Sequence, residues 1–412
     1  MTIAYADCEA LDSRDTLAHA RGRFFVPDNV IYLDGNSLGA LPRSTLPRLV
    51  QVVDREWGDD LIRSWNKNDW IGLPVRLGGH LAPLLGAEPG EVIVADSTSV
   101  NLFKLAAAAV RLMSPRCVIL TERSNFPTDL YVLQGLEEML NGAVTLRMVA
   151  RDELEQSLDE DVALLALTHV DFRTGELHDM RRLTQAAHAA GALAIWDLSH
   201  TAGAMQLSLG ADEVDLAIGC GYKYLNGGPG APAYLFVARH HQAAFRQPLS
   251  GWMGHAAPFD FTDRYRPADG MASMLCGTPP VLSMAALEEG LKTFDGINMC
   301  RVREKSAALG DLFLSLAETR CADSGFGVAS PRDSHRRGSQ ISLTHPEGYA
   351  IMQSLIEQGV VGDFRAPDIL RFGFAPLYTR YVDVWNAVER LALIMAGETW
   401  RQERFHARAA VT

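Results

Sequence analysis

Short apolar runs alternate with amphipathic stretches through the middle of this chain, and the alternation predicts its fold class. We expect strands at the short apolar runs, which lie at 92–94, 117–121, 144–149, 162–167, 192–196, 214–218 and 231–238. Apolar residues recur at helical spacing at 43–57, 100–113, 180–190 and from residue 130 onward. Strands that alternate with helices in this way predict an α/β fold with a mostly parallel central sheet, covered by helices on both faces.

The pattern changes near residue 280, where strands and helices begin to mix differently. Helices are expected at 281–294, 299–318, 348–358 and 382–396, and strands at 340–343, 360–361 and 369–374. This change predicts a second, smaller α+β domain. We expect an N-terminal segment at 1–50 that contributes to the active site and to the small domain, with one short helix at 13–23. A large domain should then occupy 51–285, and the small C-terminal domain 286–412.

Two of the expected strands end near unlike charges. The run at 192–196 stops at Asp197, and the run at 214–218 leads through glycines to Lys223. Ligands of open α/β sheets bind beyond the carboxyl ends of the strands. An acid and a lysine at that edge suit a cofactor with a basic ring nitrogen at one end and an aldehyde at the other, which describes pyridoxal phosphate. The alternative is that Lys223 is a surface lysine and Asp197 a helix cap.

Polar residues also follow the other expected strands. Thr98 and Ser99 stand where the helix after the first strand begins, and the free N–H groups of a helix N-terminus favour an anion such as phosphate. Many ordinary helices begin in the same way. Because the turns after these strands face one side of the sheet, side chains far apart in the sequence can converge there, namely Thr98, Phe126, Thr168, Asp197 and Lys223.

Three further features lie outside this alternation. The turn at 35–39 is rich in Gly, Asn and Ser, which is the chemistry of a chain reversal. Trp65 and Trp70 stand in a polar loop at 64–71 and are expected to pack against another subunit, an aromatic ligand or their own subunit's surface. Arg371 is a lone cation within an apolar strand, so its partner is either a substrate carboxylate or an internal acid.

Composition narrows the classes of function. The chain has 412 residues and a net charge of -12 without a basic stripe, which argues against nucleic acid as a partner. Its six cysteines are scattered, with no C-x-x-C pair and no clustered histidines, so neither a metal site nor a disulfide framework is expected. The N-terminus does not have the pattern of a signal peptide, and no run approaches the roughly 20 apolar residues of a membrane span. We therefore expect a cytoplasmic enzyme.

With these residues laid out, the chain resembles the kynureninases, a family of the fold type I pyridoxal-phosphate enzymes related to class V aminotransferases. The resemblance runs from Tyr32 to Tyr378. Its markers are the segments Gly-Asn-Ser-Leu-Gly at 35–39, Phe-Pro-Thr-Asp at 126–129, Trp-Asp-Leu-Ser-His at 196–200, Gly-Tyr-Lys-Tyr-Leu-Asn at 221–226, and Arg371 followed by Ala-Pro-Leu-Tyr at 375–378.

The resemblance implies a role for each of these residues. Lys223, Tyr222 and Asp197 are implied to be catalytic: Lys223 forms the Schiff base with the cofactor, Asp197 bonds its ring nitrogen, and Tyr222 is our candidate for acid/base work at the γ-carbon. Cofactor contacts in the 51–285 domain are implied for Thr98, Ser99, Phe126, Asp129, Thr168, Asp197, His200, Tyr222, Lys223, Trp252 and Thr278. Substrate contacts are implied for Ser37, Trp65 and Arg371. Thr278 reaches the phosphate from a second subunit, so the resemblance also implies a homodimer.

The implied reaction is the hydrolysis of L-kynurenine to anthranilate and L-alanine in tryptophan catabolism. Lys223 removes the Cα proton, water adds to the γ-carbonyl, and the Cβ–Cγ bond breaks. Thr98, Trp65 and Thr278 differ from the residues expected in animal members and look like the bacterial form. These differences leave 3-hydroxykynurenine as a second possible substrate. Two alternatives stay open: another class V enzyme, either an aminotransferase or a desulfurase-like lyase, and a cofactor-free scaffold of the same fold.

Overall fold

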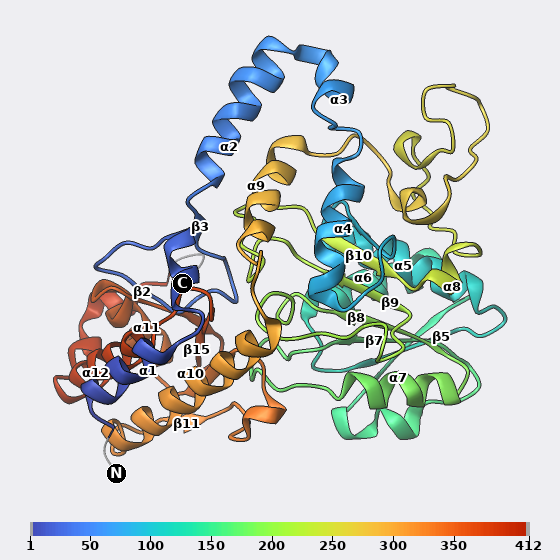
Figure 1. Ribbon diagram of the computed structural model, residues 1–412. Coiled ribbons are helices and arrows are strands. Elements are labelled where there is room, and N and C mark those ends of the chain that lie inside the picture. The colour runs from blue at the N-terminus through green and yellow to red at the C-terminus, as the bar shows by residue number, and fades with distance from the viewer. Residues whose placement is uncertain (1–2, 409–412) are drawn as a thin grey trace.

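A seven-stranded sheet lies at the centre of the larger part of the molecule (Figure 1). The computed structural model describes residues 3–408. In spatial order the strands are β4 (Val92–Val94), β10 (Tyr234–Val237), β9 (Leu216–Gly219), β8 (Leu193–Asp197), β7 (Val162–Thr168), β5 (Val118–Glu122) and β6 (Thr145–Val149). Only β10 runs antiparallel to its neighbours in this sheet. The prediction of a mostly parallel α/β sheet is therefore confirmed.

Helices cover both faces of this sheet because its strands are apolar on both sides. Successive residues of β8 illustrate this: Ala194 and Trp196 belong to one core cluster, and Leu193 and Ile195 belong to another on the opposite face. The first cluster includes residues of α4 (Leu73–Leu85), α7 (Met180–Ala189) and α9 (Val281–Lys292). The second includes residues of α5 (Thr98–Leu112) and α6 (Pro127–Met139).

The second sheet is smaller, antiparallel and built from the C-terminal part of the chain. Its spatial order is β11 (Gly327–Val328), β12 (Gln340–Thr344), β15 (Ile369–Gly373) and β14 (Asp363–Arg365). Three helices accompany it: α10 (Met299–Arg320), α11 (Gly348–Glu357) and α12 (Tyr381–Ala396). The predicted strands and helices of this region are therefore present, with β11 and β14 in addition.

The N-terminal segment packs with this C-terminal part. Tyr5 of α1 (Tyr5–Arg14) contacts Trp385 of α12 edge to face, with ring centroids 5.2 Å apart. Strand β2 (Ile31–Tyr32) pairs in parallel with β13 (Val360–Val361). Residues from both ends of the chain thus share one core cluster. The domain bounds at 50 and 285 stay a prediction.

The sequence pattern misplaced two helices. The helix expected at 13–23 is replaced by α1, which ends at Arg14, and a 3₁₀ helix at Ala18–Arg23. They are separated because the Asp15 side chain accepts the N–H of Leu17, a local bond that competes with the helix. Helix α4 was not predicted because it contains two glycines and Pro83. One of these, Gly78, packs so closely on β4 that a Cβ would lie 2.1 Å from the Val92 carbonyl oxygen.

An arm at residues 45–67 projects from the body of the molecule (Figure 1). Helix α2 (Thr45–Gln51) continues as a π-helical segment at Val52–Asp59, so the helix predicted at 43–57 is present. The loop predicted at 64–71 begins as one helical turn, α3 (Ser64–Lys67). Other short elements are the strands β1 (Phe24–Phe25) and β3 (Leu41–Pro42), the helix α8 (Arg239–Gln242) and several 3₁₀ turns. Among residues 3–408, no helix combines the length and apolar character that a membrane crossing requires.

Candidate active site

A cavity of about 280 Å³ opens at the carboxyl ends of the parallel strands. Nine of the side chains predicted to bind the cofactor line it, and they come from the turns after β4, β5, β7, β8 and β9: Thr98, Ser99, Phe126, Asp129, Thr168, Asp197, His200, Tyr222 and Lys223. The predicted convergence of these turns is therefore confirmed. The edge of the sheet where parallel strands end is where such folds bind ligands.

The strand register brings the acids and the lysine to one edge. Asp197 is the last residue of β8 and lies opposite Thr168 of β7. Lys223 follows the end of β9, and its Nζ lies 5.9 Å from the ring centroids of both Phe126 and Tyr222. The ammonium makes no hydrogen bond or ion pair within residues 3–408. By contrast, the ammonium groups of Lys104 and Lys305 each bond an acid and a carbonyl oxygen.

Two carboxyl groups share the floor of this cavity. Burial raises the pKa of Asp129 well above its ordinary value, and the negative charge of Asp197 raises it further. Burial also raises the pKa of Asp197, against the hydrogen bonds from Ser199 and the positive charge of Lys223. The Asp197 Oδ1 atom accepts the Ser199 N–H at 2.6 Å. A cation next to Asp197 would relieve this buried pair of acids.

His200 lies in the same cavity as a neutral ring. Burial, together with the positive charge of Lys223, holds the pKa of His200 well below its usual range. Its Nδ1 atom is buried and has no hydrogen-bond partner among the described residues. An unpaired buried nitrogen is costly unless a ligand satisfies it. His200 is therefore placed to hydrogen-bond a group that occupies the cavity.

These observations fit pyridoxal phosphate. Phe126 offers an aromatic face, Asp197 an anion for a protonated ring nitrogen, and Lys223 an amine for the aldehyde. Thr98 and Ser99 form the first turn of α5, where N–H groups lack partners within the helix and favour an anion. Burial raises the pKa of Tyr222, so its phenol stays protonated and can donate a hydrogen bond.

The remaining predicted cofactor residues lie outside this cavity. Thr278 lines a neighbouring cavity of about 590 Å³, which shares Ser97, Tyr222 and Ala231 with the first. Trp252 packs edge to face on Phe259, with ring centroids 5.7 Å apart.

The predicted substrate residues separate into two groups. Trp65 lies on the arm, where it packs against Trp70 with ring centroids 6.1 Å apart. Ser37 and Arg371 meet: the Arg371 Nη2 atom lies 3.3 Å from the Ser37 hydroxyl. They adjoin the cavity through Phe172, whose ring lines it and whose carbonyl oxygen accepts a 2.5 Å hydrogen bond from Arg371.

Asp363 is the partner of Arg371 that the sequence analysis missed. Its carboxylate accepts hydrogen bonds from Nε of Arg371, at 2.6 Å, and from Nη2. It also accepts the Ser37 hydroxyl at 2.8 Å. Both members of the pair are almost fully buried. An internal acid was one of the two partners expected for Arg371. Asp363 is such an acid, eight positions earlier on the adjacent strand β14.

Asp34 stands beside this group, and its pKa makes stability depend on pH. Burial, reinforced by the negative charge of Asp363, raises the pKa of Asp34 to about 7. The folded chain therefore binds a proton at Asp34 between about pH 4 and pH 7, where the unfolded chain does not. Stability contributed at this position is accordingly lost as the pH rises through that window.

We predict that Asp34→Asn removes this pH dependence. The wild-type midpoint of urea unfolding should fall relative to that of the variant as the pH rises from 5 to about 7, because only in the wild type does unfolding release a proton from position 34. Urea titrations at several pH values measure the difference. Asp323→Asn, at an exposed acid, is the matched control. Parallel curves for the wild type and Asp34→Asn would contradict the assignment.

Comparison with known proteins gives a consistent result for sequence and fold. The profile of the Kynureninase C-terminal domain matches residues 302–391. The chain is 52% identical over 408 residues to a kynureninase from Burkholderia pseudomallei, with 98% of each chain covered. It is 51% identical over 411 residues to a kynureninase from Pseudomonas fluorescens, covering 98% of this chain and 99% of that one.

Solved structures share the fold at low sequence identity. A cysteine desulfurase from Thermococcus onnurineus superposes with a TM-score of 0.77 at 16% identity, covering 92% of this chain and 98% of that chain. A variant of the protein C-DES, in which glycine is covalently linked to the pyridoxal phosphate cofactor, superposes with a TM-score of 0.78 at 16% identity. That match covers 90% of this chain and 98% of the other. At this identity the likeness shows the fold.

Proposed function

The chain belongs to the kynureninase family, and we propose that it hydrolyses L-kynurenine to anthranilate and L-alanine with pyridoxal phosphate as its cofactor. The observation that carries the proposal is the 51–52% identity to kynureninases over almost the whole chain. The nine predicted residues that line the cavity support the proposal, because Asp197, Lys223 and the N-terminus of α5 suit this cofactor. We extend the proposal to 3-hydroxykynurenine as a second substrate, and to a place in tryptophan catabolism and NAD biosynthesis.

The protein side chains would bind, orient and move protons. Pyridoxal phosphate, when bound, supplies an electron sink for the bonds broken at the substrate. Lys223 would bond its aldehyde carbon and, once displaced by substrate, take the Cα proton. Asp197 would keep the ring nitrogen protonated, with Asp129 and Thr168 beside it. Phe126 would stack on the ring, and the first turn of α5 with Tyr222, Trp252 and the partner subunit's Thr278 would hold the phosphate.

Tyr222 is our candidate for the proton transfers at the γ-carbon. Its side chain lines both cavities, so it can reach the phosphate and the space beyond the cofactor. Because burial raises its pKa, the phenol stays protonated across the ordinary pH range and can donate a hydrogen bond. A donor at this position would assist the departure of the aromatic product.

Arg371 would bind the substrate carboxylate. Its guanidinium is already oriented by Asp363 and Ser37, and it reaches the cofactor cavity through Phe172. Side chains held by such partners bind a ligand with little loss of side-chain freedom. The pair with Asp363 would therefore position Arg371. Its Nη1 atom donates one N–H to the Phe172 carbonyl oxygen and would keep its second N–H for the substrate.

The first prediction for this function concerns Lys223. Purified protein should be yellow, and borohydride should fix the cofactor on the peptide that contains Lys223, because this ammonium is unpaired. Mass spectrometry identifies the peptide, and Lys223→Arg should abolish the label. Anthranilate fluorescence from L-kynurenine, without a keto-acid acceptor, separates hydrolysis from transamination. A label on another lysine would overturn the assignment, and a colourless protein after cofactor addition would favour the scaffold alternative.

The second prediction concerns Arg371 and Asp363. Arg371→Ala should lower kcat/KM by about 100-fold or more through loss of the substrate carboxylate contact, while the cofactor spectrum is preserved. Asp363→Asn should lower kcat/KM by about 10- to 100-fold, because Arg371 loses its orientation. Arg404→Ala, which removes an exposed surface pair, is the control. Bleaching of the cofactor in Arg371→Ala would show that Arg371 is structural.

We also propose a homodimer whose interface includes the arm. The arm exposes large apolar side chains that a monomer would leave in water: Leu46, Val50, Val53, Trp57, Leu61 and Ile62. An apolar groove beside the arm is lined by residues of the arm and of 279–283, next to Thr278. A second subunit on this surface would bring Trp65 and Thr278 of one protomer toward the active site of the other.

The third prediction tests this interface. Trp57→Glu and Ile62→Glu should each convert the dimer to monomers and lower activity strongly, because a buried apolar contact would become charged. Sedimentation velocity measures the assembly. Leu393→Glu is the control, since Leu393 is 60% exposed on α12, away from the arm. A dimer that survives both arm substitutions would place the interface elsewhere.

A desulfurase reaction is the main alternative, and it requires a reactive cysteine near the cofactor. The properties of Cys220 do not favour this reaction. Cys220 is the cysteine that lines the cofactor cavity, and it is buried at the end of β9. Burial raises the pKa of the Cys220 thiol, which disfavours the reactive thiolate. The six cysteines are all unpaired, which suits a reducing compartment, and we propose a cytoplasmic location on that ground.

A further inference from the structure

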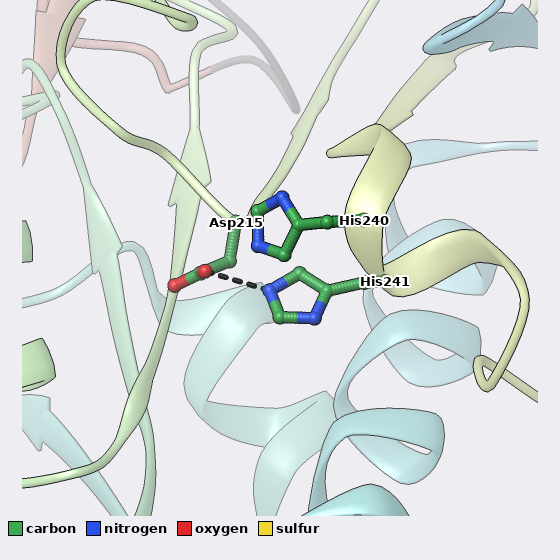
Figure 2. Close-up of side chains that lie close together, drawn as sticks. All are labelled: Asp215, His240 and His241. Carbon is green, nitrogen blue, oxygen red and sulfur yellow. Dashed lines mark hydrogen bonds and ion pairs between the residues drawn. The ribbon is translucent and has the colours of Figure 1, made fainter.

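Three histidines lie close to the buried carboxylate of Asp215, at the end of β9 opposite the cofactor cavity. Asp215 immediately precedes β9, whereas Lys223 follows the other end of that strand. His240 and His241 lie on α8, directly after β10 (Figure 2). One strand of four residues spans roughly 13 Å, so this cluster is separate from the cofactor cavity.

The Asp215 carboxylate is held in a fixed orientation. Its Oδ2 accepts the Ala194 N–H and a ring nitrogen of His188, both at 2.8 Å, and its Oδ1 bonds the His241 Nε2 at 2.8 Å. Although burial opposes it, these hydrogen bonds hold the pKa of Asp215 below its ordinary value. Asp215 is therefore an anion near neutral pH. Ligand carboxylates and imidazoles in metal sites are oriented by contacts of this kind.

The two adjacent histidines complete a set of converging ligand atoms. One atom from each of Asp215, His240 and His241 lies within 4.8 Å of the others. Figure 2 shows a nitrogen of His240 on the side of the ring that faces the other two groups. The His240 ring lies against the His241 ring, with centroids 4.0 Å apart and the planes tilted by 49°. The His240 nitrogens make no hydrogen bond within residues 3–408.

We propose that Asp215, His240 and His241 bind one zinc ion, with water in the fourth position. Zinc bonds of about 2.0–2.2 Å place tetrahedral ligand atoms about 3.3 Å apart, so the ligands need to move by about 1.5 Å at most. The exposed His240 side chain can make this movement. Two imidazoles and one carboxylate suit zinc, whereas calcium and magnesium prefer oxygen ligands. His188 would orient Asp215 without contacting the metal.

The sequence predicted no metal site because the ligands are not clustered along the chain. His240 and His241 are adjacent, but the carboxylate comes from the start of a different strand. Antiparallel pairing of β9 with β10 brings the two together: Val237 lies opposite Leu216, and the Ala238 N–H bonds the Asp215 carbonyl oxygen at 2.9 Å. Backbone pairing therefore fixes the distance between the ligands.

Zinc binding to tag-free holoenzyme, measured by isothermal titration calorimetry, tests the proposal. One zinc ion per chain is expected. His240→Gln and His241→Gln should each weaken binding by at least about 10-fold, and His188→Gln by about 10- to 100-fold through the orientation of Asp215. His240 is exposed, so its substitution should leave the fold and the yellow colour unchanged.

His19→Gln and Cys300→Ser are the matched controls, because both residues are exposed and lie outside the cluster. Both should bind zinc as the wild type does. Wild-type protein that binds no zinc, or variants at His240 and His241 that retain full affinity, would overturn the proposal. Zinc binding is measured without turnover, so its outcome is independent of whether the protein hydrolyses L-kynurenine.

Discussion

The burial of two acids at one edge of the central sheet is the constraint on which the site depends. Asp129 and Asp197 lie together beneath the cavity, and their burial makes both negative charges costly. Lys223 and the hydrogen bonds from Ser199 and Thr168 offset only part of this cost. A ligand with a protonated ring nitrogen would remove the remainder. The negative charge of the two acids is only partly compensated, so the cavity favours a ligand that carries a positive charge next to Asp197.

The buried ion pair of Arg371 and Asp363 connects the cofactor cavity to the smaller sheet. Arg371 and Asp363 lie on paired strands of that sheet, yet they also contact Ser37 from the N-terminal segment and Phe172 beside the cavity. Removing Asp363 would leave the buried Arg371 without its acidic partner, whereas Asp363 would still pair with Arg365 if Arg371 were removed. The same pair therefore joins three parts of the chain and orients the side chain proposed to bind substrate.

The sequence predicted the position of site residues best where they stand at the end of a buried strand. Apolar runs such as 192–196 predicted buried strands, and the ends of these strands predicted where the turns lie, so Asp197 and Lys223 could be placed together. Asp363 was missed because its contact with Arg371 depends on antiparallel register, which one sequence does not reveal. Helix α4 was missed because Gly78 reflects tight packing on β4 rather than helix propensity. Trp65 and Thr278 were assigned by resemblance, and their proposed roles would require a second subunit.

The pairing of β2 with β13 has a consequence for the order of events during synthesis. Residues 31–32 emerge from the ribosome early, but their partners at 360–361 are made near the end. Between them, Gly39 donates its N–H to the Tyr222 carbonyl oxygen at 2.8 Å and approaches Lys223 too closely for any side chain. The strand that leads to Gly39, next to Lys223, can therefore pair with β13 only after residue 361 has been translated. Nascent chains that stall before β13 should thus lack this strand pairing, even where the large sheet has already formed.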